Sequence, residues 1–335
     1  MQGKVIKIFS DFYYVKVKDN LIECKLREVL KKSGLQILVG DEVVVEDWNE
    51  LSNQAAISEL LPRKNSLMRP SVANVDEIIL VVCLKHPQTP FTNIDRYLAQ
   101  AQYFGVDAII CVNKSDLTEE DERKSFAKLY ENLGYKVVFT SALNKTGIDE
   151  LKSNLKGKTS ILCGPSGVGK TSLCNAIDEN FVLRTGEVSK NSRGTHTTRH
   201  CEILSFEVEN INTNLVDTPG FSLLKFDYIE PKKVEEFFSE IKEFSSGCKF
   251  SDCLHEAEAG CKVIENLDQI ASSRYESYLD ILQEAKEYKK KIKERGTKVE
   301  TRGKMINSKF VPKISAKKRD FSRRKNKQML SGEVE

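Results

Sequence analysis

The eight residues Gly164 to Thr171, with the sequence GPSGVGKT, constrain this chain more than any other stretch. They follow an apolar run, Thr159 to Cys163, that predicts a buried strand, and they precede Ser172 to Ile177, which predicts the start of a helix. A GxxxxGK[ST] segment between a strand and a helix is a phosphate loop, because its glycines let backbone N–H groups surround phosphate oxygens. The segment therefore predicts a nucleotide-binding α/β sheet.

The residues of this loop have distinct expected roles. Lys170 is expected to reach the β- and γ-phosphates and the Thr171 hydroxyl to ligate Mg²⁺, while the start of the helix adds its positive dipole end. The alternative is a glycine-rich turn without a ligand, which the full match in this context disfavours. The nucleotide-binding residues expected here are Gly164, Pro165, Ser166, Gly167, Val168, Gly169, Lys170, Thr171 and Ser172.

Two further loops predict that the base is guanine. The NKSD sequence follows a predicted strand, Ala108 to Val112, and the Asp116 carboxylate can accept from both the ring N–H and the exocyclic amine of guanine, a donor pair that adenine lacks. Behind the next predicted strand, Lys136 to Thr140, a backbone N–H of the SAL sequence can meet guanine O6. Alone, NKSD also fits an Asx turn, but two such loops at matching strand ends favour a guanine site. The expected base-binding residues are Asn113, Lys114, Ser115, Asp116, Ser141 and Ala142.

The DTPG sequence after a predicted strand, Thr213 to Val216, completes the expected magnesium site. Asp217 is expected to hold Mg²⁺ through a water, and the Gly220 N–H to contact the γ-phosphate. A polar segment, residues 181–200, predicts a loop whose Thr197 or Thr198 supplies another Mg²⁺ contact, and the sequence does not choose between the two. The expected Mg²⁺ ligands are thus Thr171, Thr197 or Thr198, and Asp217.

Residue 221 is a phenylalanine, where many GTPases carry a glutamine that orients the attacking water. Phenylalanine has no group for this, so intrinsic hydrolysis is slow or another side chain acts. His196 is the candidate catalytic residue, because an imidazole can position or deprotonate water. The alternative is a loop histidine without a catalytic role.

The motifs occur in an unusual order, since NKSD and SAL precede the phosphate loop and DTPG. The same sheet can form if the chain is cut and rejoined elsewhere, so the order predicts a circular permutation. The segment after DTPG then runs directly into a C-terminal domain, to which movement of the DTPG loop can be transmitted.

Cys248, Cys253, His255 and Cys261 lie within 14 residues. Three thiolates and one imidazole make a closed tetrahedral set that favours a structural zinc ion. Coincidental reduced thiols are the alternative. Two predicted helices, Pro231 to Phe244 and Leu267 to Tyr288, flank the cluster. The other cysteines are scattered in apolar segments, which indicates a reducing compartment.

The net charge of +3 hides a strong asymmetry. Residues 286–335 contain 18 lysines and arginines and 6 acidic residues, whereas residues 1–285 contain 34 and 43. A basic tail on an acidic body predicts a polyanionic partner for the tail, with a merely solvated tail as the alternative. Apolar runs such as Ile78 to Leu84 are too short to cross a bilayer, and the N-terminus lacks a signal-peptide pattern. We therefore expect a cytoplasmic chain without a membrane partner.

Residues 1–62 contain about five short strands with turn residues between them, which favours an OB-fold barrel. Such barrels bind nucleic acid in some proteins and only pack in others. The predicted fold class is a multidomain α/β protein with an N-terminal OB-fold β-barrel, a circularly permuted P-loop GTPase domain and a C-terminal helical zinc-binding domain. The predicted segments are an RNA-binding barrel at 1–62, the GTPase domain at 63–224, the zinc domain at 225–288 and a basic, disordered tail at 289–335.

Together these motifs resemble the family of circularly permuted ribosome small subunit-dependent GTPase A proteins. The resemblance covers about residues 1–285 and also involves Pro62 to Asn65, Val72 to Asp76 and Ile94 to Tyr97. It implies a monomer that assists late maturation of the small ribosomal subunit, binds its rRNA and hydrolyses GTP when stimulated by the subunit, with hydrolysis driving release. His196 matches the family's proposed catalytic histidine. Arg199 and Ala259 depart from the residues common in the family, and Arg199 leaves the Mg²⁺ assignment open.

Two other functions remain open from the sequence. One is an RNA-binding scaffold that binds guanine nucleotide with negligible turnover, which Phe221 keeps possible. The other is a small-molecule kinase, which leaves NKSD, SAL, the cysteine cluster and the basic tail unexplained.

Overall fold

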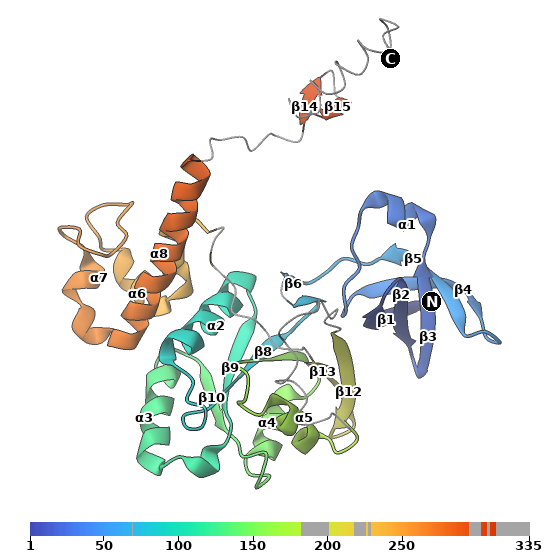
Figure 1. The fold of residues 1–335 in the computed structure, drawn as a ribbon, viewed down its shortest axis with the longest axis horizontal. Coiled ribbons are helices and arrows are strands. Elements are labelled where there is room, and N and C mark those ends of the chain that lie inside the picture. Colours follow the sequence, from blue (N-terminus) through green and yellow to red (C-terminus); the bar gives the residue numbers. More distant parts are fainter. Residues whose placement is uncertain are drawn as a thin grey trace, which may run out of the picture. The chain divides into compact units, whose positions relative to one another are not determined.

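The structure is a computed structural model that describes residues 1–68, 70–181, 201–217, 226, 229–294, 303–306 and 309–312 (Figure 1). The chain divides into two compact units, Met1–Ala285 and Lys286–Glu335, and each is described by itself. In the described part of the chain, no helix combines the length and the apolar character needed to cross a membrane.

The N-terminal residues form a closed five-stranded barrel. Its strands follow the order β1 (Gln2–Phe9), β2 (Phe12–Val17), β3 (Asn20–Leu26), β5 (Gln54–Leu60) and β4 (Glu42–Asn49), and β4 pairs back onto β1. Only β3 and β5 run parallel within it. The core is filled by alternate strand residues such as Val5, Val15, Ile22, Val43 and Ile57, all fully buried. The OB-fold prediction is confirmed.

A short helix, α1 (Glu28–Ser33), lies between β3 and β4 and was not predicted. None of its side chains is buried, so it has no apolar periodicity that the sequence could reveal.

The second part of the first unit is a sheet in the order β10 (Lys136–Phe139), β9 (Asp107–Val112), β8 (Glu77–Val82), β11 (Thr159–Cys163), β13 (Ile211–Asp217) and β12 (Glu202–Val208). The strands are parallel except β12, which is antiparallel to β13. Every residue of β8 and of β11 is buried, as expected for central strands covered on both faces. β12 also pairs with β1 at Lys7 and Glu202, whose side chains form a 2.9 Å ion pair, so the barrel continues the sheet.

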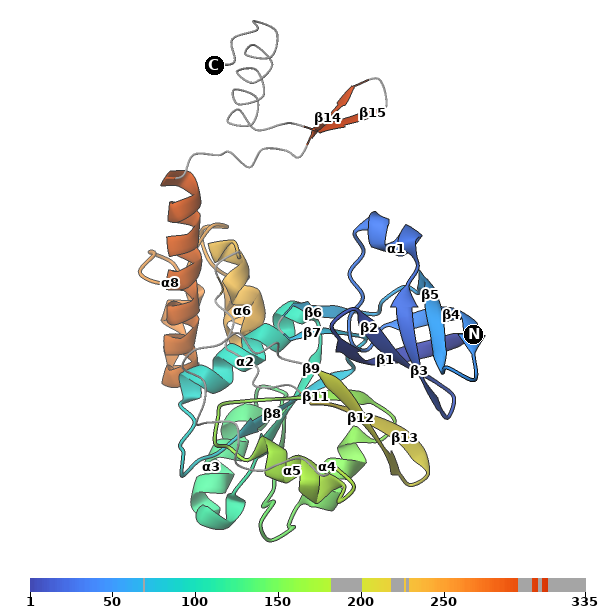
Figure 2. The same cartoon turned by 45° about the vertical axis from the view of Figure 1, so that its right-hand side comes forward.

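Helices cover the two faces of this sheet. α2 (Phe91–Phe104) and α3 (Glu120–Glu131) pack on one core, which contains Ile94, Leu98 and Phe126. α4 (Ile148–Leu155) and α5 (Lys170–Ile177) pack side by side on the other (Figure 2). The sequence predicted the helix after the phosphate loop, α5, whereas a small hairpin, β6 (Ser66–Met68) and β7 (Ser71–Ala73), was not predicted.

The helices of the cysteine-bearing segment begin and end at other residues than the sequence predicts. The helix expected over residues 231–244 is divided into a 3₁₀ helix, η2 (Pro231–Phe237), and α6 (Ser239–Ser245), because Phe238 has an extended backbone with φ −128°. Two short turns, α7 (Lys262–Glu265) and η3 (Leu267–Gln269), precede α8 (Ser272–Glu294), which extends beyond the predicted end at 288.

The second unit contains the end of α8 and an antiparallel pair, β14 (Gly303–Ile306) and β15 (Lys309–Pro312). The domain boundaries at residues 62, 224 and 288 stay predictions.

Candidate functional site

Asn113 joins the three predicted nucleotide loops at the carboxyl edge of the sheet. Its side-chain amide N–H donates to the Val168 carbonyl in the phosphate loop at 2.9 Å. Its Oδ1 accepts from the Ala142 N–H at 3.2 Å and from the Thr140 hydroxyl at 3.3 Å. Asn113 is 1% exposed, so these bonds are shielded from water. The loops that follow β9, β10 and β11 are therefore held together by one side chain.

The other residues of NKSD also link these loops. The Lys114 ammonium donates to the carbonyls of His86 and Gly167, both at 2.9 Å. The Ser141 hydroxyl donates to the Asp116 carboxylate at 2.5 Å, and Ser115 is buried. His86 lies in the loop between β8 and α2, and no sequence motif had pointed to that loop. The base-binding residues predicted from two separate loops thus lie next to the phosphate loop.

Two glycines of the phosphate loop are required by the backbone and by close neighbours. Gly164 has φ +135°, and a Cβ there would lie 2.1 Å from the Val81 carbonyl oxygen. Gly169 has φ +91°, and a Cβ there would lie 2.5 Å from Nδ2 of Asn113. Any larger residue at these positions is strained and displaces the strand or the base loop.

The phosphate loop leads into α5 as predicted. The Lys170 ammonium donates to the carbonyls of Gly164 at 2.8 Å and Pro165 at 2.7 Å, so it lies inside the loop. Thr171, half-buried, and Ser172, exposed, form the first turn of α5, whereas Val168 is fully buried and Ser166 and Gly167 are exposed. Burial raises the pKa of Cys83 to about 11, so its thiol stays a neutral donor to the Val168 carbonyl at 3.4 Å.

The remaining predicted residues are only partly described. β13 ends at Asp217 and runs parallel to β11, so the backbone of Asp217 reaches the edge of the sheet that carries the phosphate loop. The side chain of Asp217 lies outside the described residues, and so do His196, Thr197, Thr198, Gly220 and Phe221. Their roles stay predictions.

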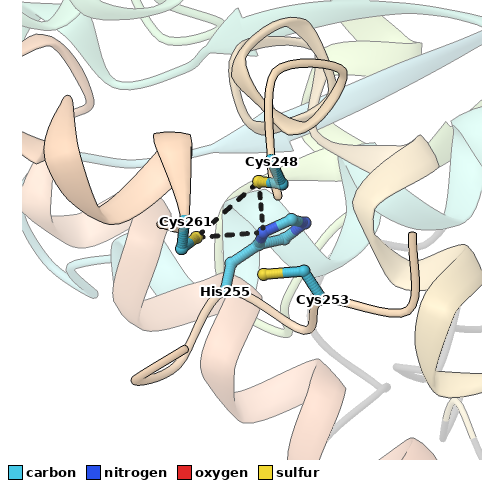
Figure 3. A group of neighbouring side chains, drawn as sticks. All are labelled: Cys248, Cys253, His255 and Cys261. Atoms are coloured by element: carbon cyan, nitrogen blue, oxygen red, sulfur yellow. Dashed lines mark hydrogen bonds between the residues drawn. The ribbon is translucent and has the colours of Figure 1, made fainter. Parts of the chain in front are cut away.

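Cys248, Cys253, His255 and Cys261 come together in one cluster, and their ligand atoms all lie within 4.8 Å of one another (Figure 3). Cys248 Sγ is 3.6 Å from His255 Nδ1 and 3.9 Å from Cys261 Sγ, and His255 Nδ1 is 3.3 Å from Cys261 Sγ. Bonds of 2.3 Å to sulfur and 2.0–2.1 Å to nitrogen place tetrahedral ligand atoms roughly 3.5–3.8 Å apart. The four side chains can therefore hold one metal ion.

Two acidic residues that the sequence did not reveal support this cluster. Glu235 Oε2 lies 2.8 Å from His255 Nε2, which fixes the fully buried ring with Nδ1 toward the cysteines. Burial acts to raise the pKa of Glu258, but backbone N–H groups including those of Leu254 and Glu256 bond its carboxylate and lower the pKa to about 2. Glu235 is 20 residues from the histidine, so only the fold brings it to the site.

A buried ion network connects this segment to α2. Arg274 of α8, which is 1% exposed, donates to Asp95 of α2 at 2.9 Å and to Glu240 of α6 at 2.7 Å. Asp95 is fully buried and also accepts from Ser277 at 2.7 Å and from Tyr130 at 3.1 Å. α2 follows the loop that contacts Lys114, so one helix connects contacts at the nucleotide loops with contacts of the C-terminal helices α6 and α8.

Three family models match this chain. One described as RsgA N-terminal domain matches residues 2–57, and one described as RsgA GTPase matches residues 60–227. A third, 50S ribosome-binding GTPase, matches residues 159–299, beginning at the strand of the phosphate loop.

Similar proteins and structures cover most of the chain. The "Small ribosomal subunit biogenesis GTPase RsgA" of Alkaliphilus metalliredigens is 40% identical over 288 residues, covering 85% of this chain and 98% of that protein. The crystal structure of YjeQ from Thermotoga maritima has a TM-score of 0.73 and 37% identity, covering 85% of this chain and 98% of that one. The structure of YloQ, described as a circularly permuted GTPase, has a TM-score of 0.70 and 33% identity, covering 85% and 95%. The predicted permuted fold is confirmed.

Proposed function

Because this chain belongs to the RsgA GTPase family, as its sequence motifs predicted, we propose that its GTP hydrolysis serves late maturation of the small ribosomal subunit. The subunit's rRNA and GTP or GDP are its partners, and the chain acts as a cytoplasmic monomer. GTP binding favours the subunit-docked state, the subunit stimulates hydrolysis, and hydrolysis drives release. The observation that carries the proposal is the contact of Asn113 with both the phosphate loop and the SAL loop.

We assign the two ends of the nucleotide to the two groups of loops. Asp116 accepts from the N1–H and the amine of guanine, and the hydroxyl of Ser141 holds that carboxylate in place. A backbone N–H of the SAL loop, whose Ala142 N–H is bound to Asn113, is directed to O6, and the stem of Lys114 covers the ring. Residues 164–172 surround the phosphates, where Lys170 balances their charge.

Magnesium is supplied with the nucleotide and stabilises charge on the phosphates. We propose Thr171 as one ligand, Asp217 as a ligand through water, and Thr197 or Thr198 as another. Gly220 contacts the γ-phosphate, and His196 positions the attacking water, because Phe221 has no group for that role. Cys248, Cys253, His255 and Cys261 bind one structural zinc ion, which three thiolates favour over harder cations.

Helix α2 offers a route by which the nucleotide affects subunit binding. Its preceding loop contacts Lys114 through the His86 carbonyl, and its Asp95 binds Arg274, next to Tyr275, whose hydroxyl donates to the His255 carbonyl. Movement at the nucleotide loops therefore changes contacts of the C-terminal helices, in addition to any movement of the segment after DTPG. Equal affinity for small subunits in the GDP and GTP states would contradict this coupling.

The test is phosphate release by the full chain with purified small subunits, and with large subunits as the matched control. We expect stimulation by small subunits only, and a decrease of roughly 100-fold in stimulated turnover for His196→Ala, as for removal of a group that handles the attacking water. Unchanged turnover in His196→Ala would remove this residue from catalysis.

The base assignment has its own control. Asp116→Asn is expected to weaken GTP binding in calorimetry and to favour xanthosine nucleotides, whose C2 carbonyl accepts where guanine donates. Binding of guanine nucleotides without stimulation by either subunit would instead support the scaffold function.

A further inference from the structure

Lys114 is fixed in place by two backbone carbonyls that come from different loops. Its ammonium donates to Gly167 in the phosphate loop and to His86 in the loop between β8 and α2, both at 2.9 Å. Its stem passes Gly169, since a Cβ built there would lie 3.9 Å from Cε of Lys114. A long lysine side chain loses much of its rotamer freedom when it is held at its end. The His86 carbonyl is therefore one of two supports that fix the path of the Lys114 stem.

The loop that carries His86, residues 83–89, is closed by one buried side chain. Thr89 is 4% exposed, and its hydroxyl accepts from the Cys83 N–H at 3.1 Å. The Thr89 N–H in turn donates to the Cys83 carbonyl at 2.8 Å. These two bonds join the ends of the segment, which we call the His86 loop, and anchor it to the end of β8.

Neighbouring segments hold the His86 loop against the phosphate loop. Cys83 Sγ lies 3.4 Å from a carbonyl oxygen of the phosphate loop, and a Cβ built on Gly167 would lie 3.4 Å from the Pro87 ring. Lys85 forms an ion pair with Glu122 of α3 at 2.8 Å. Contacts with two other elements therefore restrain the backbone that faces Lys114.

His86 has a backbone conformation that its surroundings must impose. Its φ is +48°, in the left-handed region that residues with a Cβ rarely adopt. Such strain persists where neighbouring contacts over-determine the backbone, and it is concentrated at ligand sites. The side chain of His86 is exposed, so packing in the core does not explain the conformation. The conformation instead accompanies a carbonyl that accepts from Lys114.

We propose that the His86 loop is a positioning element of the guanine nucleotide site, in which Thr89 closes the loop and the His86 carbonyl holds Lys114 over the base. This inference rests on the proposed function, because it takes the stem of Lys114 as one wall of the base site. A side chain that is already held loses less freedom when the base binds, which raises the affinity for the nucleotide. Because the loop acts at the base end, it changes nucleotide affinity and not the rate of hydrolysis.

The experiment measures the GDP affinity of full-length variants by calorimetry in the presence of Mg²⁺. His86→Gly and His86→Ile both keep the backbone carbonyl, but glycine fits a positive φ and a β-branched residue does not. His86→Ile should therefore bind GDP roughly threefold to tenfold more weakly than His86→Gly, as for the loss of one hydrogen bond. Both changes are at an exposed position, and thermal unfolding checks that the variants are folded.

Thr89 provides an independent pair of variants. Thr89→Val removes the hydroxyl that accepts from Cys83 and should weaken GDP binding by a similar factor, whereas Thr89→Ser keeps a hydroxyl and should restore most of the affinity. The matched control is Thr213→Val, because Thr213 is also buried and accepts from a backbone N–H, that of Gly157 at 3.1 Å, near the start of β13. This control should lose stability without losing GDP affinity.

A double-variant cycle tests whether the effect passes through Lys114. Lys114→Met keeps an apolar stem but removes the ammonium, so adding His86→Ile or Thr89→Val to it should cost little further GDP affinity.

Additive losses in this cycle would overturn the proposal, as would equal GDP affinities of His86→Gly and His86→Ile. A lower kcat of subunit-stimulated hydrolysis in Thr89→Val, with an unchanged KM for GTP, would also contradict it. The proposed function fails on a different result, the absence of stimulation by small subunits, whereas these GDP affinities are measured on the chain alone.

Discussion

Arg274→Met should destabilise the first unit strongly, because it leaves two acidic side chains without their buried partner. Arg274 and Asp95 are 1% and 0% exposed, and Arg274 also contacts Glu240 and lies over the Phe238 ring at 4.6 Å. Removing one member of a buried ion pair costs about 3–5 kcal/mol. At about 2 °C per kcal/mol for a chain of this size, the melting temperature should fall by roughly 6 °C or more.

The destabilisation should also depend on pH. Burial raises the pKa of Asp95 above its ordinary value, and Arg274 opposes that rise. Without Arg274 the pKa rises further, so the folded variant holds a proton that the unfolded chain releases. Its stability is then greatest below the unfolded pKa and is lost as pH rises through the folded pKa. The deficit of the variant relative to the wild type should therefore shrink as the pH is lowered from neutrality toward the ordinary pKa of a carboxyl group.

The assay is thermal unfolding followed by far-UV circular dichroism, with Arg27→Met as the matched control. Arg27 pairs with Glu46 and Asp47 at the surface, where such pairs contribute about 0–1 kcal/mol. Adding Asp95→Asn to the Arg274 variant should recover at least about 1 kcal/mol, since contacting residues couple. The reasoning is refuted if Arg274→Met is no less stable than the Arg27 control, or if the double variant is no better than the single one.

Glu235→Gln should weaken zinc affinity about 10–100-fold in competition with a chromophoric chelator, because it orients the imidazole of the cluster. The matched control is Glu236→Gln, at a neighbouring exposed residue, which should leave zinc affinity unchanged. Equal zinc affinities of the two variants would show that Glu235 does not support the site. Gly169→Ala should lower GDP affinity in calorimetry by roughly tenfold or more, because the Cβ of the new alanine would clash with the side chain of Asn113. Gly134→Ala, with φ +85° and open space around it, adds backbone strain without that clash and should leave GDP affinity unchanged.

Much of the fold follows from local patterns in the sequence. The barrel strands alternate apolar and polar residues, and the central strands β8 and β11 are continuous apolar runs, so their periodicity reveals both. Periodicity could not reveal a helix without buried side chains, nor the point at which one predicted helix is divided into two. α1 buries nothing, and the extended Phe238 separates two segments that share one apolar pattern.

The sequence by itself determined which short motifs this protein has: the GPSGVGKT segment, the NKSD and SAL sequences, and three cysteines and a histidine within 14 residues. Only the tertiary structure decided which distant groups meet. Asn113 reaches Val168 across 55 residues, Glu235 reaches His255, and Asp95 finds Arg274 across 179. Such pairs cannot be recognised from the periodicity or the composition of the sequence. Each hydrogen bond involves only one residue in each of two segments, so it creates no repeating pattern. Their partners are set by how the sheet and its helices pack.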